Sequence, residues 1–457
     1  MFEEGRSMRH FNKGPVTAFV LAAAALLTQA ISAQAPAKTG ARTITFARDV
    51  APIVQRSCQN CHRPDSMAPM SFLTYEDVRP WARAIKQKVM AREMPPWYID
   101  RTVGISKFKE DPSLSDQEIE TIAAWADGGA VRGNPADMPP PRQFENTDIW
   151  HIGKPDLVIK SATHTVPATG SDWWGDYVVN TGLAEDRYLK AVETKPAPGA
   201  KKVVHHAVTF LLQDEGESDL IGRGPTQNPA GGDAGGFLNE YAVGKNGDIF
   251  PEGTGRLVKA GAKIRFNMHY HPVGEETADQ TEVALVFYPK GYKPTYYIQA
   301  SHTGDFDDLD LPPGVDNIRS DGYTRLARNA RITSFQPHMH NRGKAQCMEA
   351  IYPDGKIEQL NCVNNYKFGW HIVYNYADDV QPLLPAGTML HVISWHNNTA
   401  SNRYNPDPRN WVGFGQRSID DMSFAWVNYI WLTDEDFKAQ VDARKGKDSR
   451  PTTQQQR

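Results

Sequence analysis

Apolar residues recur at two different spacings in this chain, and the change of spacing separates a helical part from a strand-rich part. Within residues 45–130, one run places apolar side chains at helical intervals: Ile119, Ile122, Ala123 and Ala126. Ser115 and Glu118 have the spacing of a capping box at the start of this run, and Gly128-Gly129 ends it. These signals predict a small all-α domain over residues 45–130.

Strand signals dominate after residue 148. Short runs rich in Val, Ile, Tyr, Phe and Trp alternate with clusters of Gly, Pro, Asn and Asp, and the clearest runs are 203–212, 263–269, 283–288, 389–395 and 424–432. Alternating strand and turn signals over such a length are typical of β-sandwiches. We therefore expect a multidomain protein in which the all-α domain precedes two all-β sandwich domains, over 149–310 and 311–440.

The segments between and after these domains are polar or rich in proline. Three consecutive prolines within residues 131–148 can neither continue a helix nor enter a central strand, so this stretch is predicted to be a semi-rigid linker. Residues 441–457 are polar and contain few side chains that could join a core, which predicts a disordered tail.

The N-terminus carries the signals of an export sequence. Basic residues precede an apolar run over 16–27, and small residues follow as far as Ala33-Gln34-Ala35. This is the pattern of a secretory signal peptide over residues 1–35, and the apolar run is shorter than the roughly 20 residues of a membrane-spanning helix. We expect a periplasmic or secreted mature chain without a transmembrane segment; retention of the signal as a membrane anchor is the alternative.

Charge and cysteine content exclude other classes of protein. The 457 residues include 50 Lys and Arg against 54 Asp and Glu, a net charge of -4, so no basic excess favours nucleic acid as a partner. The 4 cysteines are too few for a disulfide-stapled scaffold. Their positions are therefore more informative than their number.

Two of the cysteines belong to a haem-attachment motif formed by Cys58, Cys61 and His62. Thiols at this spacing can form thioether bonds to both vinyl groups of one covalent haem c, and the adjoining histidine can bind the iron. A redox Cys-x-x-Cys pair and half of a zinc site are the alternatives, but no second cysteine pair lies nearby in the sequence. With this motif, the segment 45–130 resembles a small class I cytochrome c.

A methionine is expected on the other face of the iron. Met94 is the favoured ligand because the two prolines that follow it would hold its loop rigid; Met67, Met70 and Met90 are the other candidates. A haem with histidine and methionine ligands has a raised potential and suits one-electron transfer.

Histidines occur in close pairs in the strand-rich part of the chain. The pairs are His205-His206, His269-x-His271 and His338-x-His340. Residues i and i+2 of a strand face the same side, so one metal ion can bind both, whereas adjacent histidines can share an ion only where the strand bends. Imidazole ligands without thiolate suit copper or zinc, and surface or hydrogen-bonded histidine is the alternative for each pair. His371, His391 and His396 stand alone and are predicted to be structural or exposed.

Four short stretches together resemble the copper type II, ascorbate-dependent monooxygenases, which are the peptidylglycine α-hydroxylating and dopamine β-monooxygenases. The stretches are 203–208, 266–270, 337–340 and 420–422. They carry, in order, His-His, His-Tyr, His-x-His and an acidic-acidic-Met element. The resemblance extends over roughly residues 150–432, most of the mature chain.

The resemblance implies two β-sandwich domains that face each other across a solvent cleft, with one copper ion in each. The ligands of the electron-transferring copper would be His205, His206 and His269. The ligands of the copper where oxygen and substrate meet would be His338, His340 and Met422. The chemistry of the family is hydroxylation of an aliphatic C–H bond of a small organic substrate by O2, with ascorbate as the reductant.

The chain departs from this family at informative positions. Only Cys347 and Cys362 remain of the family's many disulfide cysteines, and they flank a Tyr-Pro-Asp-Gly turn that could bring them together in a disulfide; two free thiols are the alternative. Gln336 stands where the peptide-amidating members have an arginine that helps bind the peptide carboxylate, so a glycine-extended peptide is not the expected substrate. His271 is a further same-face candidate that could replace His269 as a ligand.

These inferences combine into an extracytoplasmic copper-dependent monooxygenase. Its fused haem c would pass electrons to the copper of the first ligand set, in place of ascorbate or beside it, and a separate redox protein would be a partner. The alternatives are a non-catalytic haem and copper electron-transfer protein, and a structural pair of β domains with accidental histidines. Oxygen uptake coupled to product formation distinguishes the enzyme from the electron carrier.

Overall fold

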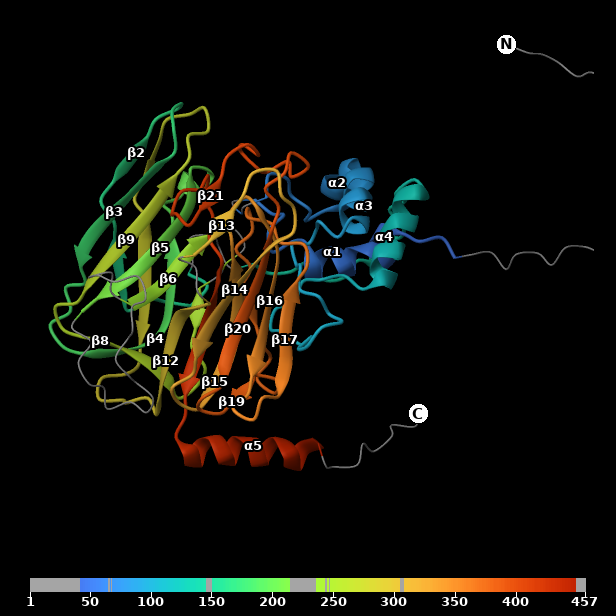
Figure 1. The fold of residues 1–457 in the computed structure, drawn as a ribbon. Helices are drawn as coiled ribbons and strands as arrows, with labels where there is room; N and C mark the ends of the chain where they lie inside the picture. The colour runs from blue at the N-terminus through green and yellow to red at the C-terminus, as the bar shows by residue number, and fades with distance from the viewer. Residues whose placement is uncertain are drawn as a thin grey trace, which may run out of the picture. The chain divides into compact units, whose positions relative to one another are not determined.

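The computed structural model describes residues 42–64, 66, 68–144, 150–213, 236–242, 245, 247–304 and 308–448. Within these residues the chain is mostly β-strand, arranged in several sheets, and its helices lie mainly before residue 128 and after residue 433 (Figure 1). The predicted signal peptide and residues 449–457 of the predicted tail lie outside the described residues.

Helical segments in the first third of the chain share a hydrophobic core. Their bounds are η1 Phe46–Val50, α1 Ala51–Ser57, α2 Tyr75–Val78, η2 Arg79–Trp81, α3 Ala82–Met90, α4 Asp116–Asp127 and η3 Pro135–Asp137. The buried residues of this core include Phe46, Val54, Val78, Ile122 and Trp125. The predicted capping box is present, since Ser115 Oγ accepts from the Glu118 N–H and the Glu118 carboxylate accepts from the Ser115 N–H at 2.8 Å. Helix α4 therefore begins and ends where the sequence predicts.

One long sheet runs through the strand-rich part of the chain. Its strand order is β1-β11-β4-β8-β12-β22-β15-β18, with β7 beside β4 and β19 beside β15. The bounds are β1 Leu157–Lys160, β4 Arg187–Lys195, β7 Asp248–Ile249, β8 Thr254–Val258, β11 Glu282–Phe287, β12 Tyr296–Thr303, β15 Ala330–His338, β18 Tyr374–Asn375, β19 Leu383–Leu384 and β22 Phe424–Trp431.

Two four-stranded sheets accompany the long sheet. The first has the order β3-β9-β5-β6, with bounds β3 Trp173–Asn180, β5 Val204–Leu212, β6 Gly236–Ala242 and β9 Lys263–Tyr270. The second has the order β14-β20-β16-β17, with bounds β14 Ile318–Arg325, β16 Gly343–Ile351, β17 Ile357–Val363 and β20 Met389–His396. Two short pairs complete the strands: β2 His164–Val166 with β10 Thr277–Asp279, and β13 Asp310–Leu311 with β21 Val412–Gly413. A short helical turn, η4 Ala200–Lys202, precedes β5.

Each four-stranded sheet shares a hydrophobic core with one half of the long sheet. The first core joins the two layers through buried residues from both: Val192, Leu211, Phe266 and Leu285. The second core joins the second four-stranded sheet to the other half of the long sheet, through the buried residues Phe335, Met348, Leu390 and Val427. Two layers of sheet around one apolar core are the arrangement of a β-sandwich, and it arises because strands with one apolar face must bury that face against another element.

Strand β12 joins the two halves of the long sheet. It pairs antiparallel with β22 over residues 298–303 and parallel with β8 at residues 296–297. A strand from before residue 310, the predicted boundary between the two sandwiches, thus belongs to the sheet of the second half. The described residues from Ile44 onward belong to one compact unit, so both halves lie in one hydrogen-bonded frame.

The C-terminal helix α5, Asp434–Asp448, corrects the predicted start of the disordered tail. Residues 441–448 belong to this helix and not to a tail. Thr433 caps the helix by accepting from the Asp436 N–H at 3.1 Å. Phe437 packs on an apolar cluster at the ends of β12 and β22. The helix escapes prediction because it is mostly polar and is anchored near its start.

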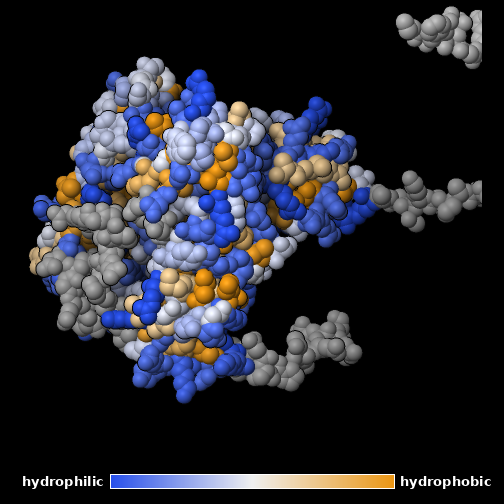
Figure 2. Space-filling view, in the orientation of Figure 1, coloured by the Kyte–Doolittle hydropathy of each residue, from blue (hydrophilic) through white to orange (hydrophobic). Residues whose placement is uncertain are grey.

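The face of the molecule drawn in Figure 2 is mostly hydrophilic, with small and separate hydrophobic patches. Scattered patches of this kind are ordinary for a folded protein surface. Within the described residues, the chain contains no helix with the length and apolarity needed to cross a membrane.

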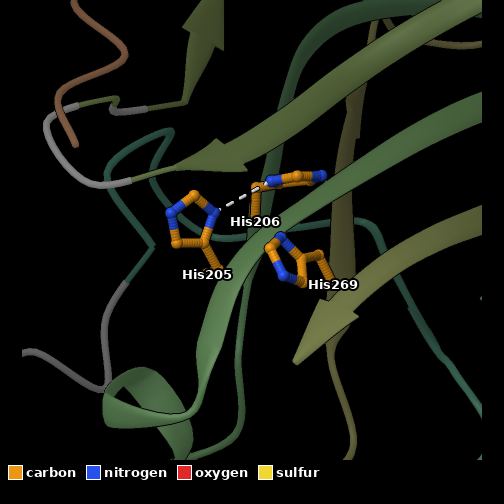
Figure 3. A group of neighbouring side chains, drawn as sticks. All are labelled: His205, His206 and His269. Carbon is orange, nitrogen blue, oxygen red and sulfur yellow. Dashed lines mark hydrogen bonds between the residues drawn. The ribbon is translucent and has the colours of Figure 1, made fainter. Parts of the chain in front are cut away.

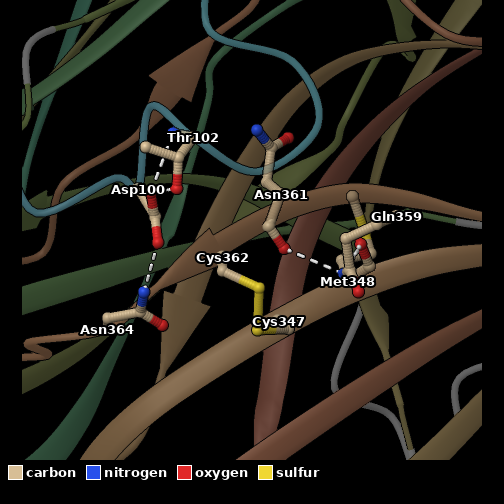
Figure 4. The surroundings of a disulfide bond; sticks show 8 residues. All are labelled: Asp100, Thr102, Cys347, Met348, Gln359, Asn361, Cys362 and Asn364. Carbon is tan, nitrogen blue, oxygen red and sulfur yellow. Dashed lines mark hydrogen bonds between the residues drawn. A yellow bond between two sulfur atoms is a disulfide. The ribbon is translucent and has the colours of Figure 1, made fainter.

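Strands β16 and β17 form the predicted hairpin, and Cys347 and Cys362 are direct partners across it. Their sulfur atoms form the expected disulfide (Figure 4). An earlier part of the chain packs along the same strand. The Asp100 N–H donates to the Cys362 carbonyl at 2.8 Å, and the Asp100 carboxylate accepts from the Asn364 amide at 2.5 Å. The disulfide thus lies where the chain before the strand-rich part joins the second sandwich.

We predict that replacing both Cys347 and Cys362 by serine lowers the free energy of unfolding by about 3 kcal/mol, the chain-entropy value for a loop of about 15 residues. Guanidinium chloride unfolding followed by circular dichroism measures this change. A reducing agent should lower the stability of the wild-type chain to that of the double variant and leave the variant unchanged. Equal unfolding midpoints for both chains without reductant would contradict a stabilising disulfide.

Candidate metal centre

Three histidines come together from two neighbouring strands, β5 and β9. His206 and His269 are direct partners across this antiparallel pair. The register shifts between Val204 and His206, so His205 is the extra residue of a β-bulge. A regular strand would turn adjacent side chains to opposite faces. The bulge removes this constraint and lets both adjacent histidines approach His269.

The rings of these three histidines, called the triad below, face one another (Figure 3). Nδ1 of His205 lies 3.1 Å from Nδ1 of His206. The ring centres lie 5.4 Å apart for His205 and His206, 4.7 Å for His205 and His269, and 5.0 Å for His206 and His269. Two imidazoles that bind one ion through bonds of roughly 2.0–2.1 Å have ring centres roughly 4.5–6.4 Å apart, depending on the angle between the two bonds. The triad can therefore hold a metal ion.

Asp172 orients the third ring of the triad. His269 Nε2 lies 2.8 Å from Asp172 Oδ2, so it donates its proton to the carboxylate, and the lone pair must then be on Nδ1. His269 Nδ1 is buried and has no hydrogen-bond partner among the described residues. His271 is exposed, and its Nδ1 contacts the other oxygen of Asp172 at 2.6 Å. His269, and not His271, is therefore the residue that the structure brings into the triad.

The three imidazoles of the triad are unprotonated at neutral pH, as histidine ligands of a metal ion must be. Burial, followed by the nearby His269 and His371, lowers the pKa of His205 to about 3. Burial also lowers the pKa of His206 and of His269, the latter although Asp172 acts in the opposite direction. Unprotonated imidazoles keep the lone pair that a metal ion needs.

His338 and His340, the second pair assigned to copper, lie where β15 ends. Their ring centres are 5.5 Å apart. The buried carboxylate of Asp421 accepts the N–H of His340 at 2.8 Å and that of Met422 at 2.9 Å, which ties both backbones to one point. His340 Nδ1 lies 3.2 Å from the Asp420 carbonyl and donates to it, so Nε2 carries the lone pair.

Met422 is close to this pair in the sheet. It lies two residues before Phe424, which is the direct partner of His338 on the neighbouring strand. Its side chain packs on an aromatic cluster that contains Phe424 and Trp426. The backbone therefore places Met422 beside the end of β15, and its role as a thioether ligand stays a prediction.

His371, for which the sequence predicts a structural or exposed position, lies beside both histidine sets. It is buried, with its ring centre 5.4 Å from His338 and 6.2 Å from His206. Phe368, from the same loop between β17 and β18, lies 5.3 Å from both His205 and His340, measured between ring centres. These two rings occupy the space between the histidine sets where the resemblance implied a solvent cleft, because the loop projects into it.

The other lone histidines have the structural roles predicted for them. His391 lies between two carboxylates, with Nε2 2.7 Å from Asp321 and Nδ1 2.7 Å from Glu349. His396 is buried, and its Nε2 donates to the Met422 carbonyl at 3.2 Å and lies 3.5 Å from Asp421. His396 thereby supports the turn that carries Met422 without joining either histidine set.

The haem-attachment motif follows helix α1. Cys58 and Cys61 are not bonded to each other, and burial raises the pKa of the Cys58 thiol to about 12. The His62 N–H donates to the Cys58 carbonyl at 2.9 Å, which closes one turn around the motif. His62 Nδ1 donates to the Met70 carbonyl at 3.2 Å, so Nε2 is the nitrogen available to an iron ion. Two free thiols and one oriented imidazole fit a covalently attached haem.

The methionine ligand of that haem stays a prediction. Met94 is partly buried in the turn after α3, where its N–H lies 3.4 Å from the Lys88 carbonyl. The side chain of Met70 packs on the helical core, and Met90 is exposed. Met67 lies outside the described residues.

Comparisons with known proteins give no family for this chain. No protein-family model matches it, and no curated protein matches it either. Similar solved structures include the major capsid protein P2 of bacteriophage PM2, with 7% identity, 60% of this chain and 99% of that chain covered, and a TM-score of 0.26. Another is the peptide:N-glycanase F, with 8% identity, 60% and 95% covered, and a TM-score of 0.25. Such low similarity carries no argument about function.

We predict that His206→Ala weakens metal binding at the triad, because one of three ligands is removed. The affinity should fall by more than the roughly 10–100-fold that is lost when a residue hydrogen-bonded to a ligand is removed. Titration of the full chain with Cu(I) against a competing chelator measures the affinity. His271→Ala is the matched control, and its copper affinity should fall less than that of His206→Ala. An equal loss of copper affinity in the two variants would show that the triad is assigned wrongly.

Proposed function

We propose that this chain is an extracytoplasmic copper-dependent monooxygenase with a fused cytochrome c. The observation that supports the proposal most directly is the triad of His205, His206 and His269, the residues that the resemblance assigns to the electron-transferring copper. Three neutral imidazoles without thiolate suit copper. The buried Nδ1 of His269 points to a bound ion, because a polar atom without a partner is costly in a protein interior.

The second centre of the proposed enzyme would be held by His338, His340 and Met422. The buried Asp421 fixes the backbones of two of these residues, and the Asp420 carbonyl fixes the tautomer of His340. In this proposal, residues 149–310 and 311–440 act as the two copper domains, and the helices of 45–130 act as the haem domain.

Each part of the chain then has a chemical task. Bound copper would supply one-electron storage at each centre and reduction of O2, so that one oxygen atom enters a C–H bond and the other leaves as water, with two electrons and two protons consumed. Bound haem would supply one-electron transfer. Asp172 and Asp421 keep the ligand rings and backbones in place, and burial by Phe368 and Phe424 limits access of water to the histidines.

The surroundings of the second centre favour an uncharged and mainly apolar substrate. Phe424 stacks on His338 with ring centres 4.7 Å apart, and Trp426 continues the aromatic cluster. Gln336 is buried and donates to the Glu240 carboxylate. Its amide is thus held by the protein and does not take the place of an arginine that binds a substrate carboxylate.

We predict that the copper-loaded chain transfers one atom from oxygen-18 gas to at least one compound in a panel of small alkyl and aryl-alkyl molecules, and that Met422→Ile does not. Isoleucine keeps an apolar side chain but lacks the thioether that favours Cu(I). Mass spectrometry detects the product, and the copper content of the triad and the haem spectrum of the variant should match the wild type. If the haem cycles with O2 while no compound gains oxygen-18, the chain is a non-catalytic electron carrier.

We predict that O2 reoxidises the reduced haem several-fold faster in the copper-loaded wild-type chain than in His206→Ala, because the triad is the electron acceptor. Stopped-flow absorbance of the full chain, reduced under argon and mixed with aerated buffer, measures the rate. The copper-free wild-type chain is the control and should behave like the variant. A haem that stays reduced in the presence of oxidised copper and O2 would exclude electron transfer from haem to triad.

A further inference from the structure

His371 differs from the other buried histidines near the site in its lack of partners. Its side chain is 3% exposed, and neither Nδ1 nor Nε2 has a hydrogen-bond partner among the described residues. His391, by contrast, has a carboxylate at each nitrogen, and His396 has a carbonyl at Nε2. A neutral imidazole has one N–H donor and one lone pair, and in His371 both are buried without a hydrogen-bond partner in the described protein. A metal ion that accepts the lone pair would satisfy one of these two groups.

The ring distances place His371 closer to the second histidine pair than to the adjacent histidines of the triad. Its centre lies 5.4 Å from that of His338, a separation that two imidazoles on one ion can have. The same centre lies farther from the triad, 6.2 Å from His206 and 6.4 Å from His205. His338 is therefore the ring with which His371 most readily shares an ion.

The loop that carries His371 also fits this position. Trp370 N–H donates to the Lys367 carbonyl at 2.9 Å, which closes a turn immediately before His371. Phe368, at the start of that turn, contacts both histidine sets and lies 5.9 Å from His371 between ring centres. A pocket of about 240 Å³ is lined by His205, His271 and His371, so the triad and the loop border the same space. The loop thus holds the ring of His371 between the two histidine sets.

We infer that His371 is a further ligand of the metal ion held by His338 and His340, which would make this centre a three-histidine site with Met422 as an additional thioether. The inference rests on the proposed function and deepens it, because it adds a donor that the resemblance does not assign. The ring centre of His371 lies 6.2 Å from that of His206, so the two centres would be close neighbours.

The variant His371→Phe tests this inference, because phenylalanine keeps the size of the ring and removes both nitrogens. Copper binding to the full chain is measured by titration with Cu(I) against a chelator, and the imidazole ligands are counted by X-ray absorption. His151→Phe, at an exposed histidine outside both sets, is the matched control. The melting temperature of the copper-free chain is measured for each variant.

The expected result has two parts. Copper-free His371→Phe melts at or above the wild-type temperature, since two uncompensated buried nitrogens are gone. Its second copper binds at least roughly tenfold more weakly and with one imidazole fewer, while the first copper and the control variant match the wild type.

Two results would overturn the inference. One is a wild-type chain that binds two copper ions together with a His371→Phe variant that binds both equally tightly and with the same ligand count; the proposed function would then stand. The other is a wild-type chain that binds no second ion at His338 and His340, which would remove the proposed function as well.

Discussion

A buried imidazole needs a partner for each of its ring nitrogens, and the structure around the histidine sets depends on this requirement. The buried ring nitrogens that lack one among the described residues are Nδ1 of His269, Nδ1 of His338, both nitrogens of His371, and Nδ1 of His396, which supports the turn before Met422. Each uncompensated polar atom costs about 1–3 kcal/mol, a large share of the roughly 5–15 kcal/mol that stabilises a typical domain. The presence of several such nitrogens near the two histidine sets is explained if metal ions accept the lone pairs that no hydrogen-bond donor satisfies.

The positions of the two histidine sets are fixed by strand pairing and by two carboxylates, and not by contacts between the imidazole rings. A β-bulge in β5 aims His205 and His206 at His269 on β9, and Asp172 fixes the ring of His269 from the outer side. In the second half, Asp421 plays a similar part, because it ties the end of β15 to the start of β22. Because β12 makes the long sheet continuous, the two anchoring frames are parts of one structure. In the proposed function, electrons would pass between neighbouring sets held in this frame without a large movement of one half against the other.

Local signals in the sequence were sufficient for features that depend on residues close together in the chain. The capping box at Ser115 and the hairpin that brings Cys347 to Cys362 are of this kind. The triad was expected from the resemblance to the copper type II monooxygenases, whereas the bulge that makes it possible leaves no clear mark in the sequence. His371 was missed because it is a lone histidine on a loop, and its importance comes only from long-range contacts. Long-range pairing also explains why the sequence did not reveal the place of β12, whose partner β22 lies more than a hundred residues away. Helix α5 was missed because its mostly polar sequence resembles a tail.

The most direct measurement of the central claim is anomalous X-ray diffraction at the copper absorption edge from crystals of the copper-loaded full chain. Two peaks are expected, one bounded by His205, His206 and His269 and the other beside His338 and His340. A single peak, or peaks away from these side chains, would contradict the claim that the buried histidines form two neighbouring copper centres.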